Sequence, residues 1–243
     1  MDRLDQWQII VPARLASSRL PGKPLADLAG KPLVARTVEN LRPLVDAGAE
    51  VMVAADDEKI IAACRAHNIA AIMTADFSTG TDRCHAAAQK TNRPWILNVQ
   101  VDEPFLAAAD LAGLAAALPT RKDDIGTLVY PDDTVASFRD PNTVKAVWTT
   151  ERRALYFSRA PIPWHRDDPE RPQNVGHHIG VYAYHRETLD RFCSLPPGTL
   201  ESIEKLEQLR ALENNMTIYV HAATKPSIGI DTSEDLANAR LRY

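Results

Sequence analysis

Short apolar runs and amphipathic stretches alternate along the first half of the chain. Four runs are typical of short buried strands, because apolar residues fill them and polar or turn-forming residues bound them. The expected strands cover residues 8–12, 51–54, 70–73 and 95–99. Between them, apolar residues at helical spacing predict helices at about 34–45 and 57–67, and a polar loop at 78–83 precedes an alanine-rich helix. Strands that alternate with helices predict an α/β fold with a mostly parallel central sheet.

The pattern changes after about residue 120, where strand-like runs follow one another with little helix between them. These runs cover residues 125–129, 143–148, 154–157 and 179–184. Residues 161–173 hold four prolines and many charges, which predicts an exposed loop or arm. We therefore expect a single domain over residues 1–243, in which an inserted β-rich lobe at about 125–185 is a natural place for a dimer contact.

Helical spacing returns towards the end of the chain. Residues 200–213 are expected to form one helix, in which Glu201 and Lys205 are spaced as a favourable i,i+4 ion pair. A strand is expected at 217–221. Thr232 followed by Asp235 matches a capping box with Asp in place of Glu, which predicts the start of a last helix.

The composition is that of an ordinary globular protein. Of the 243 residues, 45% are apolar and 25% are charged, so the chain can bury a sizeable core. A net charge of −4 disfavours a nucleic-acid surface, which would carry a broad basic excess. The three widely spaced cysteines are typical of reduced thiols. The polar amino terminus and the lack of a long apolar run disfavour a signal peptide and a membrane span, so we expect a cytoplasmic protein.

Three cations lie on the loop that follows the first expected strand. Arg14, Arg19 and Lys23 stand among small and rigid residues, including Gly22. Ligands of open α/β sheets bind beyond the carboxyl ends of the strands, and such a loop suits a polyphosphate there. The alternative is a solvated basic loop, which a single cluster does not exclude.

Two carboxylates are candidate ligands for a magnesium ion that accompanies a nucleotide. Asp102 comes directly after a buried strand, in a turn set by Pro104. Asp231 follows an apolar run and precedes the expected last helix, so it could instead cap that helix. Mg²⁺ takes one or two protein carboxylates together with phosphates and water, which fits either position.

Several other kinds of site are disfavoured. His177 and His178 are adjacent on an expected strand, so they point to opposite faces and are poorly placed to share a metal ion. The serines at 17, 18 and 158 lack the Gly-x-Ser-x-Gly elbow of a serine hydrolase. Neither the P-loop motif nor the Gly-x-Gly-x-x-Gly dinucleotide fingerprint occurs.

A series of motifs runs in order through nearly the whole chain. They are Ile10-Val11-Pro12-Ala13-Arg14, Ser18-Arg19-Leu20-Pro21-Gly22-Lys23-Pro24-Leu25, Thr79-Gly80-Thr81-Asp82-Arg83, Asn98-Val99-Gln100-Val101-Asp102-Glu103-Pro104, Tyr156-Phe157-Ser158-Arg159-Ala160, His178-Ile179-Gly180-Val181-Tyr182, Glu204-Lys205-Leu206-Glu207-Gln208 and Ile230-Asp231-Thr232. In this order they resemble the 3-deoxy-manno-octulosonate (Kdo) cytidylyltransferases, the CMP-Kdo synthetases of lipopolysaccharide precursor synthesis. The resemblance implies a Rossmann-like nucleotidyltransferase fold and a homodimer formed through the β-rich lobe.

The resemblance also implies a magnesium-dependent reaction in which CTP and Kdo give CMP-Kdo and pyrophosphate. The residues that it places in the chemistry are Arg14, Lys23 and Asp102. Those that it places around the nucleotide are Arg14, Arg19, Lys23, Ala54, Thr79, Gly80 and Arg83. Those that it places around the acidic eight-carbon sugar are Gln100, Arg159, His178, Tyr182, Glu207 and Gln208. Asp102 and Asp231 would hold the magnesium ion.

Val101 departs from the family pattern, which usually has Gly beside the metal carboxylate. A β-branched side chain lacks the backbone freedom of Gly and adds bulk near the ligands. The sequence therefore leaves alternatives open: a Kdo variant such as 8-amino-Kdo, another acidic sugar such as a sialic acid, or a catalytically silent CTP-binding paralogue.

Overall fold

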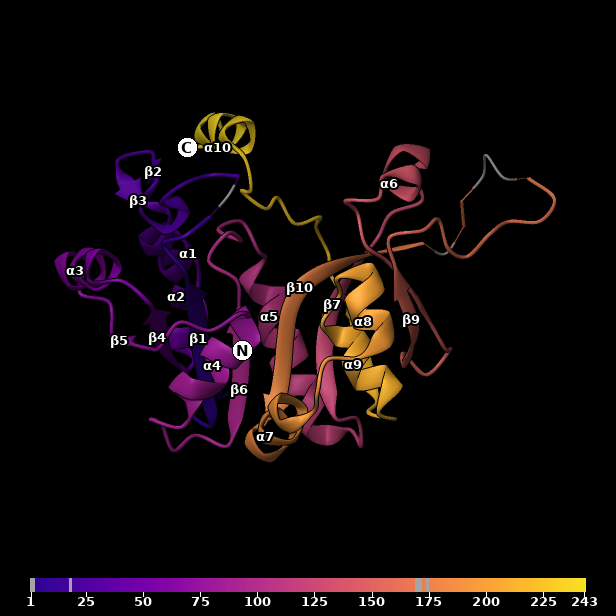
Figure 1. Cartoon of the computed structure of the whole chain (residues 1–243), viewed down its shortest axis with the longest axis horizontal. Coiled ribbons are helices and arrows are strands. Elements are labelled where there is room, and N and C mark those ends of the chain that lie inside the picture. The colour runs from indigo at the N-terminus through magenta and orange to yellow at the C-terminus, as the bar shows by residue number, and fades with distance from the viewer. Residues whose placement is uncertain (1–2, 18, 169–171, 174) are drawn as a thin grey trace. The chain divides into compact units, whose positions relative to one another are not determined.

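The computed structural model describes residues 3–17, 19–168, 172–173 and 175–243 (Figure 1). Its contacts divide the chain into two units. Unit 1 is Met1–Ala112 with Ser227–Tyr243, and unit 2 is Gly113–Pro226. The predicted inserted lobe at 125–185 lies within unit 2, but whether these residues form a lobe of their own stays a prediction. Ser18, which belongs to one of the quoted motifs, lies outside the described residues.

Unit 1 holds four strands that pair in parallel, as the alternation of strands and helices predicts. The strands are β1 (Trp7–Ala13), β4 (Glu50–Ala55), β5 (Ala71–Met73) and β6 (Trp95–Val99). Their order is β6-β1-β4-β5, and Ile9 of β1 pairs with Val51 on one side and Leu97 on the other. Every residue of β1 is buried, which explains its unbroken apolar run.

Helices pack against this sheet and connect its strands. They are α1 (Leu33–Asn40), α2 (Arg42–Asp46), α3 (Glu58–Ala66), α4 (Gly80–Ala88) and α10 (Ser233–Arg240), and α5 (Ala108–Ala117) runs across the division into units. A 3₁₀ turn, η1 (Lys23–Leu25), and a small antiparallel pair, β2 (Asp27–Leu28) with β3 (Lys31–Pro32), follow the loop after β1. Helix α4 packs on β1, β4 and β6, while α3 packs against β4 and β5.

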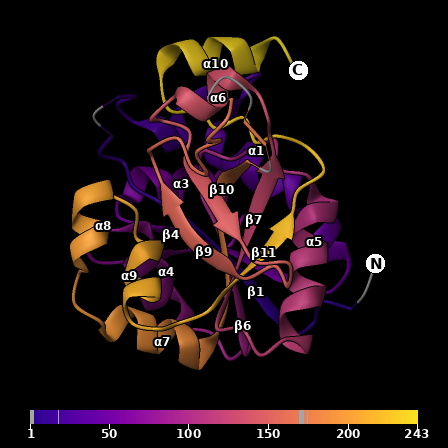
Figure 2. The same cartoon turned by 90° about the vertical axis from the view of Figure 1, so that its right-hand side faces the viewer.

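Unit 2 is built on a long strand, β10 (Gly176–His185), which pairs antiparallel with β7 (Ile125–Pro131) (Figure 2). On the far edge of β7 lies β11 (Ile218–Ala222), in parallel. Strand β8 (Lys145–Trp148) pairs with the start of β10 and with β9 (Ala154–Ser158). The remaining elements are η2 (Leu118–Thr120), α6 (Val135–Arg139), α7 (Arg186–Ser194), α8 (Thr199–Glu204) and α9 (Gln208–Glu213).

The strand predictions hold closely, and two predicted helices are wrong in extent. The helix expected at 34–45 is two helices, because Pro43 cannot donate a hydrogen bond and stands at the start of α2 instead of inside a longer helix. The helix expected at 200–213 is also two, since Lys205 adopts a left-handed conformation with φ 56°. The predicted ion pair with Lys205 is replaced by Glu201 and Arg210, 2.6 Å apart.

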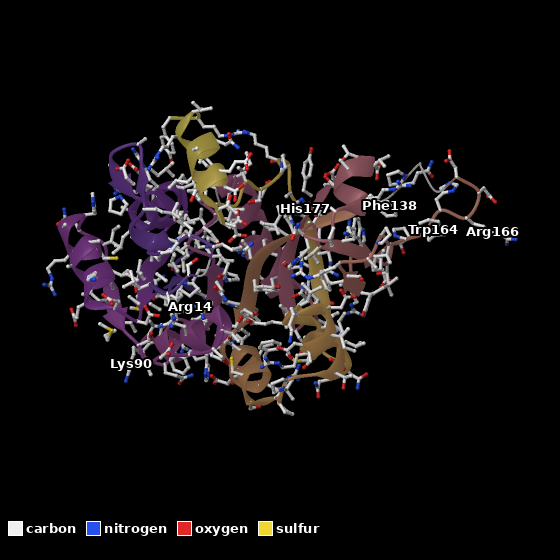
Figure 3. The ribbon with its side chains drawn as sticks, turned by 45° about the horizontal axis from the view of Figure 1, so that its top comes forward. Arg14, Lys90, Phe138, Trp164, Arg166 and His177 are labelled. Carbon is white, nitrogen blue, oxygen red and sulfur yellow. The ribbon has the colours of Figure 1, made fainter. Side chains whose placement is uncertain are left out.

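Other differences concern segments where the pattern was weak. The loop expected at 78–83 is mostly helix, because Thr79 caps α4 and the helix begins at Gly80. Helices α5 and α7 were not predicted. The residues of 161–173 that the structure describes contain no helix or strand, as expected for an arm, and Trp164 and Arg166 lie on the part that projects from unit 2 (Figure 3). No helix among the described residues is long and apolar enough to cross a membrane.

Candidate functional site

The cationic loop after β1 is held in place by its own apolar residues. Leu20 is buried in a cluster with Leu28, Leu33, Ile230 and Leu236, so the loop packs against the segment that leads into α10. Two residues after Leu20, Gly22 has a φ of 68°. This left-handed conformation favours glycine and turns the chain into η1. Packing thus brings the start of the chain against its end within unit 1.

Lys23 stands between the two predicted magnesium ligands. Its Nζ lies 2.5 Å from Oδ2 of Asp102 and 3.0 Å from Oδ1 of Asp231. Arg19 also reaches Asp231, with 3.0 Å between Nη2 and Oδ1. The backbone supports this arrangement, because Ile230 donates a 2.9 Å hydrogen bond to the carbonyl of Asp102. The carboxylates that the sequence singled out therefore meet at one ammonium group.

The charged groups of this cluster shift the pKa values of their neighbours. Burial alone would lower the pKa of Lys23, but the adjacent Asp102 and Asp231 outweigh burial and raise it, so the ammonium stays charged. Neighbouring Glu103 has its pKa raised to about 8 by burial and by the charge of Asp102. Its carboxyl group also accepts a hydrogen bond from the hydroxyl of Ser227. Near neutral pH the cluster thus holds two close carboxylates and two cations.

Asp231 is not the cap of the last helix. Thr232 is the N-cap of α10, and its hydroxyl accepts from the backbone N–H of Asp235 at 3.1 Å. This capping box confirms the prediction from the sequence and leaves the Asp231 carboxylate to the cations.

Arg14 and Arg83, both predicted to contact the nucleotide, differ in their surroundings. Arg14 is exposed just after β1 (Figure 3) and has no hydrogen-bond partner among the described residues. Arg83 is almost fully buried and binds Asp56, with 3.1 Å between Nη2 and Oδ2. The other oxygen of Asp56 accepts from the backbone N–H of Leu15 at 2.9 Å. Arg83 is therefore placed to support the cationic loop through Asp56.

The remaining predicted nucleotide residues surround the start of α4. Ala54 is fully buried in β4, so it presents little but backbone to a ligand. Gly80 lies so close to Gln100 that an added Cβ would come within 3.2 Å of its Oε1. Gln100 in turn donates to Oδ1 of Asn98 at 3.2 Å, which orients its amide. Thr79, Gly80 and Gln100 thus form one polar group beside the loop.

The described residues of unit 1 line at least two hollows. One of about 500 Å³ adjoins the cationic loop and is lined by Leu15, Ala16, Asp56, Asp57 and Asp76. A second, of about 650 Å³, lies over β4, α1 and α2, and none of the predicted site residues lines it. The position of the charged side chains, not the size of the hollow, therefore marks the candidate site.

In unit 2, strand β10 and helix α9 carry three predicted sugar residues. The rings of His178 and Tyr182 have centroids 5.6 Å apart. Burial lowers the pKa of His178 to about 3, so its imidazole is neutral, and Nε2 lies 3.0 Å from Oγ1 of Thr127. The hydroxyl of Tyr182 donates to Oε1 of Gln208 at 3.0 Å. The Nε2 of Gln208 is buried without a partner among the described residues, which leaves its amide NH₂ group for a polar ligand.

Arg159 and Glu207 complete the predicted sugar residues. Arg159 follows the end of β9, and its Nε donates to the carbonyl of Glu204 at 2.8 Å. Glu207 stands at the start of α9, close enough that its charge, after burial, helps to raise the pKa of Tyr182. Unit 2 therefore gathers Arg159, Glu207 and the aromatic pair with Gln208 on adjoining elements.

Several residues beside these side chains were not among the predicted site residues. They are Asp56, Glu103, Thr127, Lys145, Glu204 and Ser227. Most of them act through contacts distant in the sequence, such as Ser227 with Glu103, so no local spacing could have revealed them.

The donors at this cluster suit a magnesium ion only together with oxygens from a ligand and water. Among the described residues no three His, Cys, Asp or Glu side chains gather in a metal-binding arrangement. Asp102 and Asp231 nevertheless bring two carboxylate oxygens to a single cation. Two such oxygens suit Mg²⁺ when phosphate and water oxygens complete its shell, so the residues fit a nucleotide-bound ion.

Val101 does not occupy a position that requires glycine. Its φ is not among the positive values of the described residues, and its side chain is buried. Its carbonyl accepts a 2.6 Å hydrogen bond from the hydroxyl of Thr37. The expected loss of backbone freedom therefore has no visible consequence for the fold, and the effect on activity stays open.

Comparison with known proteins identifies the family. Residues 8–218 match the cytidylyltransferase family. A 3-deoxy-manno-octulosonate cytidylyltransferase of Leptothrix cholodnii is 42% identical, over 100% of this chain and 93% of that protein. The protein of that name from Chelativorans sp. is also 42% identical, over 96% and 94%.

Solved structures agree. A CMP:2-keto-3-deoxy-manno-octonic acid synthetase complexed with CTP superposes with a TM-score of 0.91 at 36% identity, covering 97% of each chain. A glucose-1-phosphate thymidylyltransferase of Bacillus anthracis, with a TM-score of 0.69 at 13% identity, shares the fold alone. The chain belongs to the 3-deoxy-manno-octulosonate cytidylyltransferase family and has its nucleotidyltransferase fold.

Proposed function

We propose that this protein transfers CMP from CTP to the anomeric hydroxyl of Kdo, giving CMP-Kdo and pyrophosphate. The observation that carries the proposal is the meeting of Lys23 with Asp102 and Asp231 beside a cationic loop, within a chain of this family. An activity of this kind would serve lipopolysaccharide synthesis in the cytoplasm, where CTP is available.

The triphosphate of CTP would bind to the cations of unit 1. Arg14 is exposed and unpaired among the described residues, so its guanidinium can take a phosphate without breaking another contact. Lys23 and Arg19 would exchange carboxylate oxygens for phosphate oxygens when the nucleotide arrives. Thr79 and Gly80 would approach the cytidine at the start of α4, while Arg83 would hold the loop through Asp56.

Asp102 and Asp231 would hold a magnesium ion on the nucleotide. Once Lys23 turned to the phosphates, both carboxylates would lose their shared cation and would be free to hold an oxygen-liganded divalent ion. A bound Mg²⁺ ion supplies charge neutralisation at the phosphates and lowers the pKa of a coordinated hydroxyl.

The carboxylate of the sugar would bind to Arg159. The guanidinium of Arg159 offers the bidentate geometry that suits a carboxylate, whereas His178 is neutral because burial lowers its pKa to about 3. If Thr127 donates its hydroxyl proton to the carbonyl of Val181 at 2.7 Å, Nε2 of His178 must carry the proton that bridges to Thr127. Its Nδ1 is then an acceptor suited to a sugar hydroxyl. Gln208, Tyr182, Glu207 and Gln100 would bind further hydroxyl groups.

The chemistry needs little covalent participation by the protein. The anomeric oxygen would form a bond to the α-phosphorus while the bond to pyrophosphate breaks on the opposite side, and the proton of the anomeric hydroxyl would pass to solvent. Arg14 and Lys23 would stabilise the charge that grows on the phosphate oxygens, and the sugar-binding residues would hold the hydroxyl in line.

The test is pyrophosphate release from CTP and Mg²⁺ with Kdo, 8-amino-Kdo and a sialic acid offered separately. We expect release with Kdo. Pyrophosphate release with 8-amino-Kdo alone, or with sialic acid alone, would show that this sugar and not Kdo is the substrate. Tight CTP binding with no pyrophosphate release in the presence of any of the three sugars would point to a silent paralogue.

We also propose a homodimer formed through unit 2. Leu155 of β9, Trp164 of the arm and Ile203 of α8 are 60%, 60% and 72% exposed, and apolar side chains so exposed favour a partner surface. Leu155→Glu should shift the mass measured by light scattering towards the monomer. Leu241→Glu changes a leucine of unit 1 that is more exposed still, at 86%, and should leave the dimer intact.

A further inference from the structure

Lys145 is a buried lysine whose ammonium group donates its hydrogen bonds to backbone carbonyls. It lies in β8 with none of its surface exposed. Its Nζ donates to the carbonyls of Asp140 at 2.8 Å, Thr143 at 2.6 Å and Arg159 at 2.7 Å. An ammonium group has three N–H donors, so all of them are used. Burying a charge is costly, and an apolar side chain would fill the same space without that cost, which indicates a role beyond packing.

Glu204 also forms hydrogen bonds with Arg159. Its Oε2 accepts from the backbone N–H of Arg159 at 2.9 Å, and its Oε1 accepts from the hydroxyl of Ser158 at 2.6 Å. Its own backbone carbonyl accepts from Nε of Arg159 at 2.8 Å. Lys145 therefore holds the carbonyl of Arg159, and Glu204 holds its N–H and its Nε.

The guanidinium is oriented by the turn that Lys145 closes. Nη1 of Arg159 donates to the carbonyl of Pro141 at 3.0 Å, and Pro141 lies between the two other carbonyls that Lys145 binds, those of Asp140 and Thr143. Among the described residues Nη2 of Arg159 has no hydrogen-bond partner. The network therefore fixes Nε and Nη1 of the guanidinium and leaves Nη2 to a ligand.

We propose that Lys145 and Glu204 are positioning residues that orient Arg159 to receive the carboxylate of the acidic sugar. This inference rests on the proposed function, in which Arg159 binds that carboxylate. Fixing a guanidinium before binding reduces the entropy lost when a bidentate pair forms. The two residues thus act on sugar affinity through Arg159.

The experiment is steady-state kinetics of the full-length enzyme with CTP and Kdo varied in turn. Lys145→Met keeps the length of the side chain and removes its donors. We expect it to raise the KM for Kdo by roughly tenfold to one-hundredfold while leaving the KM for CTP near that of the parent enzyme. Lys122→Met, at an exposed lysine of unit 2, is the matched control and should change neither constant.

A double-mutant cycle separates positioning from general damage. If Lys145 acts through Arg159, Lys145→Met should add little to the rise in KM for Kdo already caused by Arg159→Ala. Glu204→Gln, which keeps the side-chain shape, should show the same dependence on Arg159 and serves if Lys145→Met fails to fold.

The outcomes are distinguishable. A parent enzyme that releases no pyrophosphate with any acidic sugar would overturn the proposed function, and this inference with it. Suppose that the parent enzyme turns over Kdo and that Arg159→Ala raises the KM for Kdo. This inference alone is then overturned if Lys145→Met and Glu204→Gln raise the KM for CTP as much as the KM for Kdo. It is also overturned if their effects on the KM for Kdo add fully to that of Arg159→Ala. An Arg159→Ala enzyme with an unchanged KM for Kdo also overturns it.

Discussion

The ammonium of Lys23 lies 2.5 Å from Oδ2 of Asp102, at the place where a cation would be needed when a nucleotide is bound. The same Nζ lies 3.0 Å from Asp231, so one ammonium group pairs with both proposed magnesium ligands. In the proposed reaction this side chain must leave the carboxylates for the triphosphate. Lys23 is therefore an internal cation between the two carboxylates in this structure, and we propose that a ligand displaces it.

Replacing Lys23 by methionine should separate its two roles. We predict that Lys23→Met lowers kcat/KM by about one-hundredfold to one-thousandfold, the cost of one electrostatic contact to the transition state. It should also strengthen the binding of Mg²⁺ alone, because the carboxylates of Asp102 and Asp231 lose their bound ammonium. The measurement is the rise in thermal midpoint on adding MgCl₂ without nucleotide, compared with the parent enzyme.

The control for this variant is Lys90→Met, which changes an exposed lysine of unit 1 (Figure 3). It should alter neither activity nor the response to Mg²⁺. An unchanged Mg²⁺ response in Lys23→Met would argue against Asp102 and Asp231 as a pair of metal ligands.

Arg83 should matter more for stability than for binding. Its side chain is only 2% exposed and pairs with Asp56, while Nη1 donates to the hydroxyl of Thr74 at 2.7 Å. Arg83→Met leaves the Asp56 carboxylate without its buried partner, so we predict a loss of roughly 3–5 kcal/mol in the free energy of unfolding. Urea denaturation measures this loss.

Arg42→Met is the comparison for that experiment. Arg42 pairs with Asp46 on the surface, with both side chains more than half exposed, so its loss should cost no more than about 0.5 kcal/mol. Equal losses in the two variants would show that the pair of Arg83 with Asp56 contributes no more than a surface contact.

The pair of Glu201 with Arg210 predicts a pH-dependent stability. Burial alone would raise the pKa of Glu201, but hydrogen bonds from Arg210 and from the backbone of Gly198 outweigh it and lower the pKa below 4.5. The folded state thus binds a proton on Glu201 less readily than the unfolded state. The stabilisation is present above the unfolded pKa and is lost as the pH falls through the folded pKa.

We therefore predict that the parent protein exceeds Glu201→Gln in thermal midpoint near neutral pH, and that the difference shrinks as the pH falls below about 4. Thermal unfolding across this range measures it. Glu187→Gln is the control, because Glu187 is 89% exposed and its difference from the parent should stay small at every pH. A difference for Glu201→Gln that does not change with pH would contradict the assignment.

The apolar runs predicted the strands of both units well, because a strand such as β1 is buried along its whole length and its composition shows this directly. The breaks in helices were harder to predict. Lys205 has a left-handed conformation that ends α8, and Arg210 is the residue that pairs with Glu201. Both features depend on tertiary contacts.

Long-range contacts also limit what could be predicted of the site. Lys23 and Asp231 are 208 residues apart, so only the resemblance to a family placed them at one site. The network around Arg159 joins Lys145 in one strand with Glu204 in a helix, and no local pattern relates these residues. The motifs therefore indicated side chains that would face ligands, but not those that hold them.

Val101 tests whether the departure from the family pattern affects function. Its φ is not positive and its side chain is buried, so glycine would add no conformation that the fold uses. We predict that Val101→Gly lowers the free energy of unfolding by roughly 2–3 kcal/mol, through lost burial and added chain entropy, and does not improve the KM for Kdo. Urea denaturation and kinetics with Kdo check the two parts.

Val101→Ala separates bulk from backbone freedom, because alanine removes most of the side chain but keeps an ordinary backbone preference. If the isopropyl group narrowed the sugar site, both variants would lower the KM for Kdo by a similar factor. If only Val101→Gly lowered it, the reaction would require a backbone conformation at residue 101 different from the one in this structure. Unchanged KM values in both variants would show that the turn before Asp102 accepts valine at no cost to sugar binding.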